Sequence, residues 1–407
     1  MGKKIVVLPG SEWQIPIIKK SKAKGYKTFV INPYEESPAF KYADGYLQSD
    51  IFDVERVVKY CEDIKADAVI SEECDIAMPL LAELGERLCL PALDRESARL
   101  FTDKYEMREF SRRNGLHVPE YRMCRTLEET VDFFEFINSK IIIKPLDSNS
   151  SRGVFTIEST EDIRRHFEET LSFSKVRNAI LAEQYIEGTE FTVDGIKTPD
   201  RHCTLAISQK KHYAYNSNIA CELYFTHDSE LYDYQELTVE NDLFVNKSSL
   251  QFGLTHAEYK FQNGRYYLIE IAARGGGNLI SSHIVPFMSG VDNYDYLLEC
   301  ALGNITSPEF EVNKNLRERC AVLRFFDPPA ERGIVEKIDG LDILRNNPDI
   351  LAYGFNIKAG TYIENAQNDA ERAGFYIAGC EKKSELDQLI KDIDNNVKIV
   401  CRQEIKI

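Results

Sequence analysis

The stretch GLTHAEYKFQNGRYYLIEIAARGGGN, residues 253–278, constrains the fold of this 407-residue chain more than any other. Two strand-like runs flank Asn263 and Gly264, and an Asn-Gly pair in this setting is a strong signal for a β-hairpin. A loop of these two residues alone would put Glu258 and Glu270 on opposite faces. A longer loop, 262–264, separates apolar from charged side chains almost completely. Because hydrophobic patterning sets strand register, we predict the three-residue loop.

The predicted register gathers charge on one face of the hairpin. That face carries His256, Glu258, Lys260, Leu268, Glu270, Ala272 and Arg274, and the other carries Ala257, Tyr259, Phe261, Tyr267, Ile269, Ile271 and Ala273. The two glutamates become diagonal neighbours, with Cβ atoms roughly 7–8 Å apart. Carboxylates about 4 Å apart repel by about 4 kcal/mol at an effective dielectric constant of about 20. Either Lys260 and Arg274 neutralise the acids, or the acids bind a divalent cation. The hairpin alone leaves both interpretations open.

The N-terminal segment alternates between strand-like and helical patterns. Apolar runs lie at 4–8, 27–32 and 67–70, and helical patterns lie at 14–25 and 53–65, the second with Asp53 as its expected N-cap. Such alternation predicts βαβ units and a parallel sheet. The Gly-rich fingerprints of dinucleotide and P-loop sites do not occur, so we predict neither kind of site.

The remaining chain has a different pattern. Helical patterns lie at 103–114, 160–171 and 290–302, residues 179–273 resemble mostly strands, and a further unit from about 313 combines strands with the amphipathic helix 384–396. The sequence therefore predicts an α/β and α+β fold. Its three expected domains are 1–95, 96–312 and 313–407.

Composition restricts the partners of the chain. The balance of 50 Lys+Arg against 66 Asp+Glu gives a net charge of −16, which disfavours nucleic acid and anionic membrane surfaces. An anionic ligand must therefore meet a local cluster of cations. The 10 cysteines form no C-x-x-C motif, which favours reduced thiols and a cytoplasmic location. No apolar run approaches the ~18 residues of a membrane span, and we expect no signal peptide.

Two further stretches combine a strand with polar residues. In IIIKPLDSNSSRGV, residues 141–154, an apolar run ends at Lys144 and continues into a loop of small polar residues. In LAEQYIEGTEFTVDG, residues 181–195, Glu183 ends an apolar run and Glu190 follows a turn. By spacing alone these glutamates could be surface residues around that turn.

Taken in order, these stretches resemble the ATP-grasp superfamily. The ordered set is Lys104, the lysine and small-residue loop of 144–153, the pattern E-x-Y-I-x-G-x-E at 183–190, and the acids and arginine of 258–274. The runs EIAARGGG and DSNSSRGV most resemble the carboxylate–amine (L-amino-acid) ligase branch, which is related to biotin carboxylase and carbamoyl-phosphate synthase. The resemblance implies a pre-ATP-grasp domain, an ATP-grasp clamp of two α+β subdomains with a lid at about 115–182, and a C-terminal α+β domain.

The resemblance also implies roles for individual residues. Lys104 and Lys144 would bind phosphates of ATP, and Ser148, Ser151, Arg152 and Gly153 would close over these phosphates. Adenine would be held by Glu183 and the main chain of Tyr185 and Ile186, and the ribose by Glu190. Glu258 and Glu270 would ligate Mg²⁺, and Arg274, with Glu270, would serve catalysis. One departure is Ala272, where much of the superfamily has an asparagine ligand. One or two ions are therefore possible, Asn278 could substitute for the missing ligand, and Mn²⁺ could replace Mg²⁺.

The activity implied is that of an ATP-dependent ligase that forms an amide or peptide bond through an acyl-phosphate and releases ADP and phosphate. Its partners would be a small carboxylate and a small amine, and we expect a homodimer. Candidate substrate residues are Glu12 and Glu73 for an ammonium group, Gly276 for close approach of substrate, and His283 near the glycine run. The alternatives are a biotin- or bicarbonate-using carboxylase, a formate-using purine-type enzyme, and a non-catalytic ATP-binding regulator.

Overall fold

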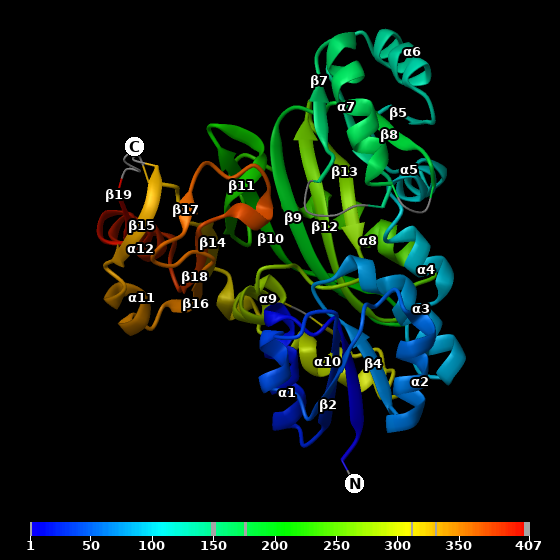
Figure 1. The fold of residues 1–407 in the computed structure, drawn as a ribbon, viewed down its shortest axis with the longest axis vertical. Helices are drawn as coiled ribbons and strands as arrows, with labels where there is room; N and C mark the ends of the chain where they lie inside the picture. Colours follow the sequence, from blue (N-terminus) through cyan, green and yellow to red (C-terminus); the bar gives the residue numbers. More distant parts are fainter. Residues whose placement is uncertain (1, 148–151, 175–176, 311, 330–331, 403–407) are drawn as a thin grey trace.

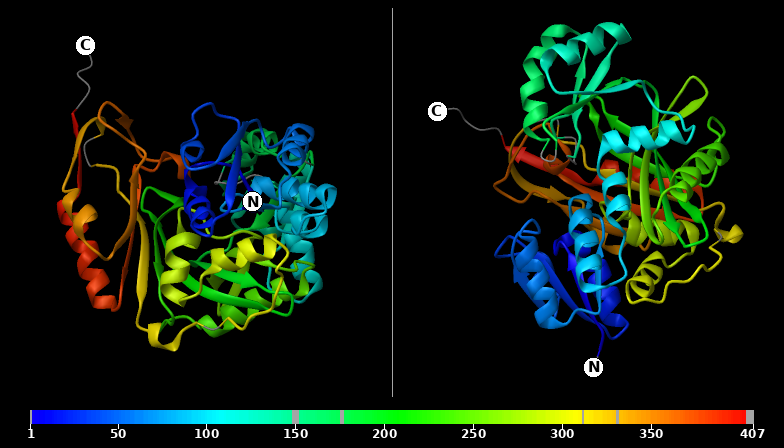
Figure 2. Two further views of the ribbon diagram at one scale, coloured as in Figure 1. Left: turned by 90° about the horizontal axis from the view of Figure 1, so that it is seen from below. Right: turned by 90° about the vertical axis from the view of Figure 1, so that its right-hand side faces the viewer.

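The computed structural model describes residues 2–147, 152–174, 177–310, 312–329 and 332–402 (Figure 1). An N-terminal domain and a smaller unit of strands and helices lie at opposite ends of a large sheet, and the C-terminal strands extend that sheet sideways (Figure 2). In the described residues no helix combines the length and the apolar character that crossing a membrane requires.

The N-terminal domain is the predicted parallel sheet. Its strands run in the order β3-β2-β1-β4 and are β1 (Lys4–Leu8), β2 (Lys27–Asn32), β3 (Gly45–Gln48) and β4 (Ala68–Ser71). The helices are α1 (Ile15–Ala23), α2 (Val54–Ile64) and α3 (Met78–Leu88). The predicted N-cap is confirmed, because the Asp53 side chain accepts from the Arg56 N–H at the start of α2.

The large sheet has eight antiparallel strands in the order β13-β12-β9-β10-β11-β14-β18-β16. These are β9 (Thr189–Lys197), β10 (His202–Tyr213), β11 (Asn216–Phe225), β12 (Gly253–Gln262), β13 (Arg265–Ala272), β14 (Cys320–Phe325), β16 (Ile350–Phe355) and β18 (Gly374–Cys380). Because β11 pairs with β14, the sheet continues across the predicted domain boundary between 312 and 313. The boundaries themselves remain predictions.

A second antiparallel sheet with its own core lies in the segment predicted to form the lid, and we use the name lid for this sheet and its helices. Its order is β5-β8-β6-β7, with β5 (Tyr121–Cys124), β6 (Ile141–Pro145), β7 (Phe155–Ile157) and β8 (Ile180–Gln184). The helices α6 (Leu127–Ile137) and α7 (Thr160–Ser172) pack on it and bury Phe133, Ile143 and Phe167. Lys144 therefore lies on a strand in which most of the neighbouring residues are buried.

The remaining elements connect these sheets. They are α4 (Arg95–Leu100), α5 (Lys104–Arg113), α8 (Tyr234–Lys247), α9 (Val285–Ser289), α10 (Asn293–Ala301), α11 (Asp342–Asn346), α12 (Lys383–Asn396), and the small sheet β17-β15-β19 formed by Tyr362–Ile363, Gly333–Asp339 and Lys398–Arg402. One continuous apolar core joins the N-terminal sheet to the large sheet, with Ile5 and Val30 in the same cluster as Leu205 and Phe225. This shared core holds the ends of β1 and β4 against the large sheet.

Candidate functional site

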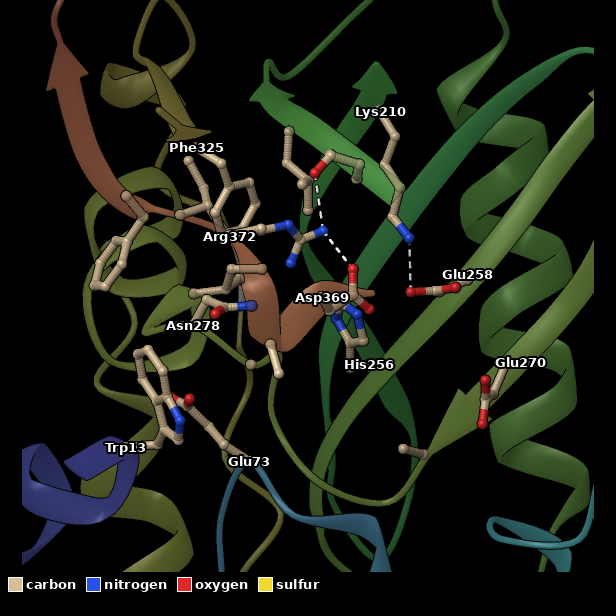
Figure 3. Close-up of a pocket in the computed structure, with 18 of the residues that line it drawn as sticks. Trp13, Glu73, Lys210, His256, Glu258, Glu270, Asn278, Phe325, Asp369 and Arg372 are labelled. Carbon is tan, nitrogen blue, oxygen red and sulfur yellow. Dashed lines mark hydrogen bonds and ion pairs between the residues drawn. The ribbon is translucent and has the colours of Figure 1, made fainter. Parts of the chain in front are cut away.

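A cavity of about 500 Å³ lies where the N-terminal domain, the large sheet and the C-terminal strands meet (Figure 3). The predicted residues among those that line it are Glu12, Glu73, Glu190, Glu258, Glu270 and Arg274. Side chains from all three parts of the chain therefore face one space, with acids and cations from the large sheet on one wall.

The hairpin register differs from the prediction, and the difference matters. The loop has two residues, because Gln262 pairs with Arg265. A β-bulge then shifts the register between Tyr259 and Glu258, so that Glu258 pairs directly with Glu270. The predicted three-residue loop was wrong because a bulge in mid-strand restores the same separation of faces that a longer loop would give.

The bulge also changes which side chains enter the core. Tyr266 and Leu268 are each 1% exposed and lie in the core. The prediction had placed Tyr267 and Ile269 there. Between the bulge and the end of β13 the predicted pattern holds again, with Ile271 buried.

Arg108 on α5 fixes the bulge. Its fully buried guanidinium donates from Nη2 to the carbonyl oxygen of Ile269 at 2.6 Å, and Ile269 is the residue that the bulge inserts. The Nε of Arg108 donates to Glu183. The strand conformation that brings the two acids together is thus held by a cation from another element.

Two lysines compensate the charge of the paired acids. Lys210 Nζ lies 2.7 Å from Glu258 Oε1 and 2.6 Å from Glu190 Oε1, and Lys104 Nζ lies 2.7 Å from Glu270 Oε1. Burial alone would raise the pKa of Glu190, but the charge of Lys210 lowers it below its ordinary value. The charge of Lys210 also lowers the pKa of Glu258, so Glu190 and Glu258 are held as carboxylates.

The compensating cations are not the ones expected from the hairpin alone. Lys260 lies over the ring of Tyr185, with its Nζ 4.7 Å from the centroid, and Arg274 pairs with an acid of the N-terminal domain. Lysines from β10, which lies two strands away from β12 in the same sheet, and from α5, which packs on β13, take their place.

The acids fit a hard divalent cation. The Glu258 and Glu270 side chains are 31% and 33% exposed at the cavity wall, and carboxylate oxygen is the donor that Mg²⁺ prefers. Among the described residues no cluster of three or more His, Cys, Asp or Glu could hold a metal, and Ala272 adds no donor. A cation here would take its remaining ligands from phosphate oxygens and water.

Lys144 and Glu183 form a buried ion pair under the lid. Glu183 is 1% exposed and binds both Lys144 Nζ and Arg108 Nε. Burial lowers the pKa of Lys144 to about 8, although the charge of Glu183 opposes this shift. The Glu183 carboxylate, expected to hold adenine, is buried and bonded to the strand lysine and to Arg108. Its contact with adenine stays a prediction.

The other lid residues are placed as follows. The Tyr185 N–H donates to the Lys140 carbonyl, so the predicted adenine contact rests on the Tyr185 carbonyl and on the main chain of Ile186. Gly153 has a φ of +71°, and a Cβ there would lie 2.6 Å from the Phe173 ring. Arg152 is exposed. Ser148 and Ser151 lie outside the described residues.

Arg274 is anchored by the N-terminal domain. Its Nε and Nη2 bind the two carboxylate oxygens of Asp75 at 2.8 Å and 2.9 Å, and Nη1 donates to the Gly275 carbonyl. Burial alone would lower the pKa of Arg274, but the Asp75 carboxylate raises it. A permanently charged guanidinium therefore stands at the cavity wall.

Glu73 brings a half-buried acid to the same cavity. Its φ of 54° is unusual for a residue other than glycine, its Oε2 accepts from the Leu279 N–H at 3.3 Å, and its Oε1 is buried without a partner in the described part of the chain. Burial raises the pKa of Glu73 well above its ordinary value. Glu12, by contrast, is exposed at the cavity rim.

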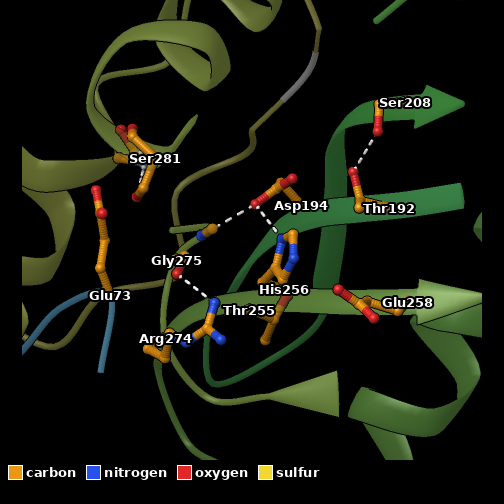
Figure 4. A network of polar contacts seen from close by, with 12 residues as sticks. Glu73, Thr192, Asp194, Ser208, Thr255, His256, Glu258, Arg274, Gly275 and Ser281 are labelled. Carbon is orange, nitrogen blue, oxygen red and sulfur yellow. Dashed lines mark hydrogen bonds and ion pairs between the residues drawn. The ribbon is translucent and has the colours of Figure 1, made fainter. Parts of the chain in front are cut away.

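The glycine run approaches another acid of the protein. The Gly276 N–H donates to Asp194 Oδ1 at 3.1 Å, and His256 Nδ1 lies 2.9 Å from the same oxygen (Figure 4). A Cβ on Gly276 would lie 2.5 Å from Asp194 Oδ1. Gly277, one residue further, lines the cavity. In the structure Asp194 lies against Gly276, and the close approach of substrate to this glycine stays a prediction.

His283 does not reach the cavity. It lies in a π-helical turn, Ile280–Ile284, its Nδ1 is 2.7 Å from Ser282 Oγ, and it is not among the described lining residues. Sequence reasoning instead missed Arg108, Lys210 and Asp194. The run QKKH in β10 was the available signal for Lys210, since it interrupts a strand otherwise rich in apolar residues.

Two domain models match the chain. Residues 137–283 match the ATP-grasp domain, and residues 324–402 match the L-amino acid ligase C-terminal domain 2. The chain thus contains an ATP-grasp domain. More particularly, its ATP-grasp domain is followed by a C-terminal domain of the L-amino acid ligase type.

The chain is also similar to curated relatives over part of their length and to solved structures over nearly all of theirs. The formate-dependent phosphoribosylglycinamide formyltransferase of Bacillus subtilis (strain 168) is 24% identical over 187 residues, which are 46% of this chain and 49% of that protein. The chain thus spans about half the length of the curated relatives it matches. An L-amino acid ligase from Bacillus licheniformis shares the fold with a TM-score of 0.83, at 20% identity over 99% of both chains. A phosphoribosylglycinamide synthetase from Anaerococcus prevotii gives 0.74 at 20% identity, over 99% of this chain and 100% of that one.

Proposed function

We propose that the chain is an ATP-dependent carboxylate–amine ligase that forms an amide or peptide bond and releases ADP and phosphate. The observation that carries this proposal is the direct pairing of Glu258 with Glu270 at the wall of a cavity that also contains Arg274 and Lys210. Two acids on one strand pair can bind the metal ion of a nucleoside triphosphate, and the cations on both sides can bind its phosphates.

In this proposal the chain contributes position and charge. Lys104 and Lys144 bind phosphates, Tyr185 and Ile186 present main-chain groups to adenine, and Glu190 binds the ribose. Glu258 and Glu270 hold Mg²⁺, which when bound neutralises phosphate charge and polarises the transferred group. Arg274, fixed by Asp75, stabilises negative charge that develops during transfer.

The proposed reaction has two steps. A carboxylate oxygen of the acid substrate attacks the γ-phosphorus of ATP, and the bond to the ADP oxygen breaks. The amine nitrogen then attacks the acyl carbon, phosphate leaves with the bonding electrons, and the nitrogen loses a proton to complete the amide. We propose that Glu73 and Glu12 bind the ammonium form of the amine, because both acids face the cavity. Burial raises the pKa of Glu73, and an ammonium group beside it would favour its carboxylate form.

A trapping experiment tests this function. The protein is incubated with MgATP, hydroxylamine and pools of carboxylates, and hydroxamate and ADP are measured together. Equal amounts of hydroxamate and ADP support an acyl-phosphate. ADP release that requires only bicarbonate would replace the ligase with a carboxylase, and tight MgATP binding without any turnover would replace it with a regulator.

A formate-using ligase that acts on a ribonucleotide amine is the second candidate. The match to formate-dependent phosphoribosylglycinamide formyltransferases favours it, although the L-amino acid ligase-type C-terminal domain favours the first. Formate-dependent ADP release that appears only with a phosphoribosylated amine would select this candidate. Light scattering on the purified protein tests the proposed homodimer.

A further inference from the structure

The C-terminal wall of the cavity carries an arginine that neither the ATP site nor the metal pair uses. Arg372 follows the 3₁₀ turn Asp369–Glu371, is 7% exposed, and lies across the cavity from the glutamate pair (Figure 3). Its main chain is pinned to the end of β16, because Asn356 Nδ2 donates to the Arg372 carbonyl at 2.9 Å. The main chain that carries the guanidinium is thus fixed before any ligand arrives.

The contacts of Arg372 leave part of its guanidinium uncommitted. Both recorded oxygen acceptors, the Ala220 carbonyl at 2.8 Å and Asp369 Oδ1 at 2.6 Å, belong to Nη2. The Nε is buried and has no acceptor in the described part of the chain. An arginine has five N–H donors, so further acceptors are needed to satisfy this group.

The other strong cations of the cavity are more fully engaged. Lys210 bridges Glu190 and Glu258, and Arg274 gives two nitrogens to Asp75. By contrast, only one nitrogen of Arg372, Nη2, contacts Asp369. The Asp369 side chain is 31% exposed and able to turn toward water. In a cavity with many carboxylates, an additional anion would therefore be stabilised best beside Arg372.

Apolar surface surrounds this guanidinium. Its central carbon lies 3.8 Å from the centroid of the Phe325 ring, and the rings of Trp13 and Phe375 lie 5.7 Å apart on the same cavity wall. An aromatic ring behind a guanidinium orients the arginine and limits its hydration. A carboxylate attached to an apolar group would match both features.

We propose that Arg372 forms a substrate subsite for a carboxylate next to an apolar group, separate from the carboxylate that is activated at the metal pair. The proposal rests on the ligase function and names the chemistry of one substrate. The second carboxylate belongs either to the acid substrate or to the amine, and the subsite makes Arg372 a determinant of specificity.

Direct binding tests the subsite without turnover. The probes are 3-phenylpropionate and its neutral amide, compared by thermal shift and calorimetry. The acid should bind the unaltered protein at least about tenfold more tightly than the amide, as expected for a charged hydrogen bond. Arg372→Gln should remove this preference, whereas Asp369→Asn should increase it, because the competing carboxylate is gone. If Arg372 had only a structural role, Arg372→Gln would weaken the binding of the acid and of the amide by the same factor.

A matched control lies outside the cavity. Arg319 also stacks on a phenylalanine, 4.8 Å from the Phe287 centroid, and also pairs with one acid, Glu381. Arg319→Gln should keep the preference for the acid. Equal binding of acid and amide by the unaltered protein, or a preference that survives in Arg372→Gln, overturns the subsite. If Arg372→Gln does not fold, an Asp369→Asn variant without tighter binding overturns it instead.

Kinetics then assign the second carboxylate to one substrate. With hydroxylamine in place of the amine, Arg372→Gln should raise the KM of the acid at least about tenfold if the acid carries the group. Unchanged hydroxamate formation with a raised KM for the amine assigns the group to the amine. If the unaltered protein forms no hydroxamate, the ligase function fails, while the binding result still decides whether the subsite exists.

Discussion

The Nη2 of Arg108 donates a hydrogen bond to the Ile269 carbonyl at 2.6 Å, so a buried side chain of α5 holds the residue that makes the bulge in β13. Without that inserted residue, Glu270 would point away from Glu258. Arg108 also binds Glu183 beneath the lid, and Lys104 of the same helix binds Glu270. Helix α5 thereby connects the Lys144–Glu183 ion pair of the lid with the proposed metal site.

Replacing Arg108 should therefore weaken metal binding. In Arg108→Met the bulge loses its clamp, and we expect Mn²⁺ affinity in the presence of ADP to fall about tenfold or more, measured by electron paramagnetic resonance. Stability should also fall by about 3–5 kcal/mol, because a buried ion pair loses one partner. The exposed Arg112 of the same helix gives the control Arg112→Met, which should change neither quantity. Mn²⁺ affinity that stays constant in Arg108→Met would show that the bulge forms without this arginine.

The Glu270 carboxylate should be needed for metal-dependent turnover. Glu270→Gln keeps the shape of the side chain but removes the charge that a cation requires, so ADP release should fall about 100-fold or more. Excess chelator should lower ADP release by the unaltered protein to the same extent, and added Mg²⁺ should restore ADP release. The exposed acid Glu168 on α7 provides the control Glu168→Gln, which should remain active. Full activity of Glu270→Gln would refute the metal assignment.

The sequence predicted those elements whose signals are local. The strands at 4–8 and 27–32 were predictable because apolar runs bounded by polar residues and glycine mark buried strands. β3, Gly45–Gln48, was missed because it is short and half-buried at alternate residues only. The paired acids could be predicted to share a face, but not through a bulge, since two registers give the same pattern of faces.

The cations of the site were harder to predict because their partners are distant in the sequence. Lys210 meets Glu258 across 48 positions, and Arg108 meets Glu183 across 75. The run QKKH marks an interruption of its apolar strand, but neither this run nor the sequence around Arg108 shows that the cation is buried and bridges two acids. Only the strand order of the large sheet and the crossing of α5 bring these groups together.

Nucleotide affinity should depend on pH through Lys144. Burial lowers the pKa of Lys144 to about 8, so the side chain is cationic below that pH and neutral above it. Because only the cation attracts phosphate, ATP affinity should be constant below about pH 8 and should fall by up to about tenfold per pH unit above it. Lys144→Arg keeps its charge and should bind ATP with a flat profile from pH 7 to 9.5. A profile with the same slope in both proteins would assign the titration to another group.

The absence of a side chain at Gly276 should matter for folding as well as for the site. A Cβ there would lie 2.5 Å from Asp194 Oδ1 and 2.9 Å from His256 Nδ1. These two atoms contact each other in the interior, and the Gly276 N–H donates to the same Asp194 oxygen. Gly276→Ala must push this pair apart, and overpacking of this kind typically costs about 1–3 kcal/mol. Gly277→Ala is the matched control, because its Cβ would meet no atom within 4 Å among the described residues. Thermal unfolding should therefore show a lower midpoint for Gly276→Ala and an unchanged one for Gly277→Ala. Equal midpoints would mean that the glycine run can move away from Asp194, and that the tight contact seen there is not required for the fold.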